Sequence, residues 1–275
     1  MKKIILSLIL LIFIFGCQPK STQEEKFEIN LIKGAGFIYE GKKILEGENF
    51  RIGLELINYY NNEKIGTVCV YDNQNIYYGG IERDCSNFYV SAAQVYNNER
   101  KPGISKLYFP KEGYYSYKNL PQINISIQPE IYIEIQYIQQ TQFLGTLNYP
   151  SPETESLSFS DGIISLQIEK SIHQLPSNYK ILLDIKIDKK KDVNISSDGK
   201  NNSLFFSIEA KPLVISCNAK NRKISQAEII NLEKENFIRC EILTNSMNQE
   251  SIPLILQLNY KINEIKKIKI NVEKM

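Results

Sequence analysis

The sequence predicts an all-β protein built from two antiparallel β-sandwich domains. After residue 27, apolar and polar residues alternate along most of the chain, which is typical of strands that bury one face. About seven or eight short runs of this kind fall in each half of roughly 120 residues, a spacing that favours two sandwiches. The clearest runs cover residues 50–56, 123–137, 164–168, 181–187, 252–260 and 268–272.

A boundary between the two domains is expected at residues 149–156, where Pro, Ser and Glu residues leave little to bury. We therefore expect one domain at residues 27–149 and a second at residues 150–275. Each carries one pair of cysteines and ends in two closely spaced strands, an order that hints at duplication. At this architectural level the halves resemble the immunoglobulin-like modules of bacterial surface proteins, although the chain contains no Trp.

One segment, between Cys217 and Cys240, carries the signals of a helix start. Ser225 is followed three residues later by Glu228, in the manner of a capping box, ahead of an apolar stretch at residues 229–232. Two structures are compatible with this pattern: a helix of two or three turns, or a loop that contains a 3-10 turn.

The four cysteines other than Cys17 form two pairs that are local in sequence, Cys69 with Cys85 and Cys217 with Cys240. An even number of cysteines favours disulfides if the chain is exported, which the N-terminus described below predicts. Each bond would close a loop of about 15–25 residues and contribute about 3 kcal/mol. A metal site is the alternative, but the chain lacks a Cys-x-x-Cys motif and its one histidine is far from both pairs in sequence. We expect disulfides and no metal.

The N-terminus has the features of an export signal. Two lysines precede an apolar run at residues 4–15, and about 12 residues are too few for the roughly 20 that span a bilayer. Residues 14–17, Ile-Phe-Gly-Cys, resemble the lipobox of bacterial lipoproteins. The resemblance implies that residues 1–16 are a cleaved signal peptide and that Cys17 carries the lipid. An ordinary secretory signal cut elsewhere and an uncleaved anchor are the alternatives.

The polar stretch that follows is expected to act as a flexible tether at residues 17–26, because it has no apolar residue able to join a core. The lipid anchor would hold the protein on the cell membrane or the outer membrane, outside the cytoplasm.

Charge and motifs exclude several function classes. Removal of the signal leaves 31 basic against 31 acidic residues, so the mature chain has no basic excess for nucleic-acid binding. Nucleophile-elbow, phosphate-loop and His-Glu-x-x-His motifs are absent from the sequence. His173 lies in a turn-like stretch without a neighbouring serine or acid motif and is interpreted as a surface residue. We expect a non-enzymatic protein without a cofactor.

Two loops, residues 72–75 and 192–199, are rich in oxygen ligands of the kind that bind calcium. Neither matches the EF-hand pattern with its closing glutamate. Asp198-Gly199 is more simply the turn of a β-hairpin.

Tyrosine is the residue type whose distribution most resembles a functional signal, because 15 of the 17 tyrosines precede residue 151. Tyrosine suits protein or carbohydrate recognition, but it also has a high strand propensity, so both interpretations stay open. The leading hypothesis is contact with a protein partner, and the alternative is a carbohydrate or other ligand bound in a groove with convergent Asn or Asp. The candidate binding residues are Tyr59, Tyr60, Tyr77, Tyr78, Tyr114, Tyr115 and Tyr117.

Overall fold

The computed structural model describes residues 25–74, 76–96, 99–120, 126–149, 155–176, 178–211, 213–220, 222–244 and 250–274. Strand follows strand, and within these ranges the single helical element is a 3-10 turn, η1 (Ile76–Tyr78). The all-β class is therefore confirmed. Within these ranges we find no helix with the length and apolar character that crossing a membrane requires. The expected signal peptide and Cys17 lie outside the described residues.

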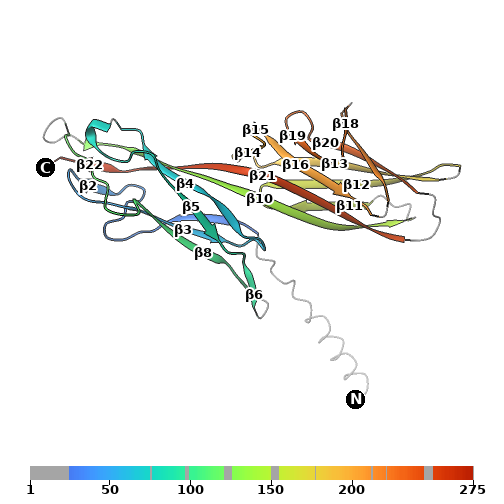
Figure 1. Ribbon diagram of the computed structural model, residues 1–275, viewed down its shortest axis with the longest axis horizontal. Helices are drawn as coiled ribbons and strands as arrows, with labels where there is room; N and C mark the ends of the chain where they lie inside the picture. The colour runs from blue at the N-terminus through green and yellow to red at the C-terminus, as the bar shows by residue number, and fades with distance from the viewer. Residues whose placement is uncertain are drawn as a thin grey trace, which may run out of the picture.

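A long two-stranded ribbon runs through the whole molecule (Figure 1). It consists of β10 (Glu130–Tyr149) and β21 (Glu250–Lys269), which pair antiparallel over all twenty residues of each strand. At about 3.3 Å per residue the ribbon is roughly 65 Å long. Alternation buries one of its faces, through side chains such as Ile133 and Leu256, and leaves the other to solvent.

One end of the ribbon belongs to a region that we call the N-terminal lobe. Here β4 and β5 extend the ribbon sheet beside β10, and a three-stranded sheet of order β1-β3-β8 packs against its buried face. The strands are β1 (Phe27–Leu31), β3 (Ile52–Asn58), β4 (Lys64–Asp72), β5 (Asp84–Val90), β8 (Gly103–Phe109) and the separate hairpin β6 (Gln94–Tyr96) and β7 (Glu99–Lys101).

The other end of the ribbon belongs to the C-terminal lobe. Here β16 joins β21 and β19 joins β16, while a six-stranded sheet of order β11-β12-β13-β20-β17-β18 packs on the buried face. The strands are β11 (Glu155–Ser160), β12 (Ile164–Gln174), β13 (Tyr179–Lys189), β14 (Asn194–Ser197), β15 (Lys200–Asn201), β16 (Ser203–Glu209), β17 (Ile215–Ala219), β18 (Arg222–Ile224), β19 (Ala227–Asn231) and β20 (Phe237–Thr244).

The chain returns to the N-terminal lobe at its C-terminal end. After β21, the short strand β22 (Asn271–Glu273) pairs in parallel with β2 (Lys43–Leu45) and antiparallel with β9 (Ser126–Ile127). Strands from both sides of the expected boundary at 149/150 therefore build this lobe. The buried apolar side chains form one continuous cluster through both lobes.

Both expected disulfides are present and each joins directly opposed residues on neighbouring antiparallel strands. Cys69 on β4 is bonded to Cys85 on β5, and Cys217 on β17 is bonded to Cys240 on β20. The two bonds differ in burial, since Cys85 is exposed although Cys69 is buried at 8% exposure, whereas Cys217 and Cys240 are both buried in the core of the C-terminal lobe.

Two local expectations have opposite outcomes. Asp198 and Gly199 both adopt positive φ and connect β14 to β15, which confirms the hairpin turn. The segment after Ser225 is neither a helix nor a loop, because residues 227–231 form β19. Ser225 does donate its backbone N–H to Glu228 Oε2 at 2.9 Å, but pairing with β16 overrides this local signal and places the β-branched Ile229 and Ile230 in a strand.

Candidate functional site

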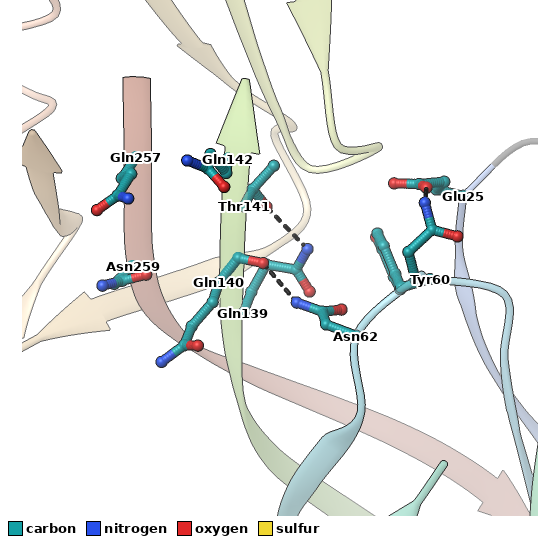
Figure 2. A pocket seen from close by; sticks show the side chains of 10 residues that line it. Glu25, Tyr60, Asn62, Gln139, Gln140, Thr141, Gln142, Gln257 and Asn259 are labelled. Carbon is teal, nitrogen blue, oxygen red and sulfur yellow. Dashed lines mark hydrogen bonds between the residues drawn. The ribbon is translucent and has the colours of Figure 1, made fainter. Parts of the chain in front are cut away.

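A polar groove of about 520 Å³ lies where the two lobes meet. It straddles β10 at the point where β4 stops covering that strand's edge, since the β10–β4 pairing ends at Tyr137 and Gly66. Seven of its ten lining residues carry side-chain amides. They are Asn61, Asn62, Gln139, Gln140, Gln142, Gln257 and Asn259, joined by Glu25, Tyr60 and Thr141. Figure 2 draws the side chains that line the groove.

One wall of the groove is the loop between β3 and β4, and Asn58 shapes it. The buried Asn58 side chain donates to the carbonyls of Asn62 and Ser91 at 2.7 and 2.9 Å and accepts from the backbone N–H of Tyr60 at 3.0 Å. These bonds fold the loop back on itself. Asn62 then extends to the edge of β10 and donates to the carbonyl of Gln140 at 2.6 Å (Figure 2).

A buried lysine lies beneath this wall. Lys64 Nζ donates to Asn62 Oδ1 at 2.9 Å and to Gln139 Oε1 at 2.5 Å, and it lies 4.1 Å from the centroid of the Tyr60 ring. Burial lowers the pKa of Lys64 from 10.5 to about 8, against the opposing pull of the negative charges on Asp161 and Glu25. The ammonium is thus mostly protonated at neutral pH and rigidly held.

The opposite wall consists of amides on the outer face of the ribbon. Gln140 lies directly across from Asn259, and Gln142 lies directly across from Gln257. Figure 2 shows these four side chains on the side of β10 away from Tyr60, Asn62 and Glu25. Unlike the amides of the loop wall, they make no side-chain hydrogen bond to another described residue, so their donors and acceptors are available to a ligand.

Asp161 fixes the two lobes together below the groove. It is fully buried, and its carboxylate accepts from Tyr260 OH at 2.6 Å, from Thr141 Oγ1 at 2.8 Å and from the backbone N–H groups of Ile163 and Ile164. Its backbone carbonyl accepts from Tyr60 OH at 2.6 Å. A residue of the C-terminal lobe thereby holds the loop wall that the N-terminal lobe supplies.

Two of the three tyrosine clusters meet at the end of the N-terminal lobe away from the groove. Lys118 N–H donates to the Tyr78 carbonyl and Gly80 N–H to the Ser116 carbonyl, so η1 and residues 114–119 lie side by side. Gly79 permits this approach, since it has a φ of +70° and a Cβ there would lie 2.6 Å from the Ser116 oxygen. We call Tyr77, Tyr78, Tyr114 and Tyr115 the tyrosine end.

The seven candidate tyrosines have different environments. Tyr77 and Tyr114 are 67% and 62% exposed, whereas Tyr59, Tyr78 and Tyr115 are half-buried. Tyr60 and Tyr117 are buried, so they cannot offer a contact surface. Tyr117 stacks on Phe50 and donates to Asp72 Oδ2 at 2.8 Å; burial and this carboxylate raise its pKa, and burial also raises the pKa of Asp72.

The remaining expectations concern His173 and metal binding. His173 lies exposed on β12 rather than in a turn. Within the described ranges, His, Cys, Asp and Glu side chains form no group of three that could hold a metal ion.

The groove was not predicted from the sequence, although the alternation of residues in β10 contains part of the information needed. Alternation along 131–147 places Gln140 and Gln142 on the solvent face and Gln139 among buried residues. A glutamine in a core register indicates a buried polar partner, which is Lys64. The pairing of β10 with β21, which brings Gln257 and Asn259 opposite, depends on contacts more than one hundred residues apart and leaves no local trace.

No protein-family model matches this chain, and no curated protein matches it either.

Proposed function

We propose that this protein is an exported, lipid-anchored, non-enzymatic binding protein, and that the groove between the lobes is its binding site. In this proposal each lobe is an immunoglobulin-like β-sandwich, and the two share the β10–β21 ribbon. The observation that carries the proposal is the wall of four free amides, Gln140, Gln142, Gln257 and Asn259, facing a loop wall that is already held in place. A preformed site with open hydrogen-bonding groups can bind a ligand without reorganisation.

The anchor proposal rests on the lipobox-like residues 14–17 and is supported by the two disulfides, which form and persist outside the cytoplasm. Seven residues, 18–24, separate Cys17 from Glu25, which already contacts Asn61 at the groove. Such a tether spans at most about 30 Å when fully extended. A lipid on Cys17 would therefore keep the groove close to the membrane surface.

Capture of envelope material tests the binding proposal. Solubilised envelopes from the source cells are passed over immobilised wild-type protein and over the Gln142→Ala/Gln257→Ala variant, and the retained carbohydrate and protein are quantified by mass spectrometry. We expect a component that the wild type retains and the variant loses. Equal retention by both, or none by either, would contradict the proposal.

Contact with a protein partner through the tyrosine end is a second candidate, and the exposed rings of Tyr77 and Tyr114 favour it. Rigid exposed tyrosines offer contact area at low entropic cost. A photo-crosslinking amino acid at position 77 or 114 should link the protein to one partner in living cells. The same amino acid at Phe237, an exposed position of the C-terminal lobe, is the control, and an identical crosslink pattern there would contradict this candidate.

A further inference from the structure

We propose that the ligand of the groove is a neutral oligosaccharide, held across the outer face of the ribbon by the four free amides and by two exposed aliphatic side chains, Ile138 and Leu144. This inference rests on the proposed binding function and names the chemical class of the ligand. Three properties of the groove support it: the pattern of its hydrogen-bonding groups, the neutralisation of its charges, and the apolar side chains at its two ends.

The free amides form a grid that suits hydroxyl groups. Directly opposed residues on paired strands lie about 5 Å apart, and residues two apart on one strand lie about 7 Å apart. Each amide offers donors and an acceptor, and each hydroxyl is both donor and acceptor, so the two types of group can pair in either direction. The grid consists of Gln140 and Gln142 on β10 with Asn259 and Gln257 on β21.

The charges at the groove are already engaged. Glu25 Oε1 accepts from Asn61 at 3.0 Å and from Arg100 at 3.3 Å. Lys64 is buried beneath Asn62 and Gln139 and donates to both. Among the lining residues, an anionic or cationic ligand would find no free counter-charge to offset the cost of its desolvation. Beyond them, the exposed Lys261 lies directly across from Ile138 on β21, so an anionic sugar is the competitor that the charged probe below tests.

Exposed aliphatic side chains flank the amide grid on the same face of β10. Ile138, two residues before Gln140, is 55% exposed, and Leu144, two residues after Gln142, is 68% exposed. They can contact the C–H faces of a sugar, a role that the buried Tyr60 ring cannot fill. The six residue-to-residue steps from Ile138 to Leu144 span about 20 Å, which is longer than one sugar ring and favours a chain of several.

An extended peptide added to the edge of β10 is the main competing ligand. Such a peptide would use the backbone groups that face away from β21. Within the groove, the Gln140 carbonyl is already occupied by Asn62 Nδ2. The free groups are side chains on the outer face, which favours the oligosaccharide.

Ligand-observed NMR and titration calorimetry test this inference on the full protein, extracted from membranes in a detergent without a sugar headgroup. The probes are maltohexaose, cellohexaose and tri-N-acetylchitotriose, with a heparin hexasaccharide as the charged probe and a neutral six-residue peptide as the competitor. We expect saturation transfer to at least one neutral oligosaccharide and none to the charged or peptide probe.

Two variants connect that binding to the groove. Gln142→Ala/Gln257→Ala should weaken it about tenfold, the loss expected from two neutral hydrogen bonds. Gln142→Glu keeps the shape but removes both donors and should weaken binding as well. Gln167→Ala/Gln174→Ala, at exposed strand positions of β12, is the matched control and should bind like the wild type.

The outcomes separate this inference from the proposed function. If no neutral oligosaccharide binds while envelope capture still depends on Gln142 and Gln257, the ligand class is wrong and the groove remains a binding site. Preference for the heparin or peptide probe overturns the inference in the same way. If envelope capture also fails, the proposed function fails with it.

Discussion

Each lobe contains one disulfide between directly opposed residues of neighbouring strands, but the two bonds differ in burial. In the N-terminal lobe the Cys69–Cys85 bond lies on the outer face of the sheet, and Cys85 is exposed. In the C-terminal lobe the Cys217–Cys240 bond is buried in the core. The parity of the strands explains the difference, because Cys69 alternates with the buried Val68 and Val70, whereas Cys217 shares its face with the buried Ile215. The spacing of the cysteines in the sequence does not by itself predict whether a disulfide lies on the outer face of a sheet or in the core.

The lobes also differ in where they expose polar and aromatic groups. The tyrosine end and the loop wall of the groove both belong to the N-terminal lobe, in connections between its strands. The C-terminal lobe contributes Asp161, which holds that loop in place. The loop wall and the residue that holds it in place therefore come from different lobes.

The largest expected effect comes from removal of the two disulfides one at a time. Each disulfide closes a loop and stabilises the fold by about 3 kcal/mol. Cys217→Ala/Cys240→Ala also leaves a cavity in the core, so we expect it to lower the free energy of unfolding by about 4 kcal/mol. For Cys69→Ala/Cys85→Ala we expect a loss of about 3 kcal/mol. Urea unfolding measures both. In the wild type, mild reduction of the native protein followed by alkylation should label Cys69 and Cys85 first. Equal labelling of both pairs would contradict the assignment of faces.

Asp161→Ala tests whether the C-terminal lobe supports the groove wall. The change leaves four donors without an acceptor, two of them buried and two half-buried, and we expect a loss of about 3 kcal/mol in the free energy of unfolding, measured by urea titration. Asp184→Ala is the control, since it breaks a partly exposed ion pair with Arg239 and should cost less than about 1 kcal/mol. Similar losses of stability for the two variants would contradict the proposal that Asp161 holds the groove wall in place.

Lys64 should make the free energy of unfolding increase with pH above pH 8. Its pKa is lowered to about 8 in the folded protein, so between pH 8 and pH 10 the unfolded chain binds more protons and stability rises with pH. We expect a gain of about 1–2 kcal/mol between pH 8 and 9.5, since one pKa unit corresponds to about 1.4 kcal/mol. Above about pH 10 the trend reverses, because burial raises the pKa of Tyr260 and Tyr137 and the folded state retains their protons.

Chemical denaturation at several pH values measures this slope. Lys64→Met should abolish the rise between pH 8 and 9.5, whereas Lys180→Met, at an ion pair with Glu241 on the C-terminal lobe, should retain it. A rise that persists in Lys64→Met would assign the slope to another group.

The smallest expected effect separates exposed from buried tyrosines. Tyr77→Ala and Tyr114→Ala should each change the free energy of unfolding by less than about 0.5 kcal/mol, because both rings are exposed. Tyr117→Phe removes the hydroxyl of a buried ring that donates to the half-buried Asp72, and it should cost about 1–3 kcal/mol. Thermal unfolding compares the three variants, and a larger loss at Tyr77 than at Tyr117 would contradict the burial described above.

Sequence reasoning succeeded where the signal is local and failed where it depends on distant contacts. Alternation predicted the strands, the two cysteine pairs were assigned correctly, and Asp198-Gly199 was recognised as a turn. The strand at 227–231 was missed because its stability comes from pairing with β16. The seven tyrosines were chosen because they are neighbours in the sequence. The direction in which each side chain points depends on its position in a strand or turn, so Tyr60 and Tyr117 are buried while Tyr77 and Tyr114 are exposed.

The central claim is that an anchored, disulfide-stapled protein presents its groove at a membrane surface. Intact-mass measurement and non-reducing peptide mapping of the protein extracted from membranes test it most directly. We predict a mature chain that begins at a lipid-modified Cys17, with linked peptides for Cys69–Cys85 and Cys217–Cys240. An unmodified N-terminus, or free thiols at all four of the other cysteines, would contradict the account.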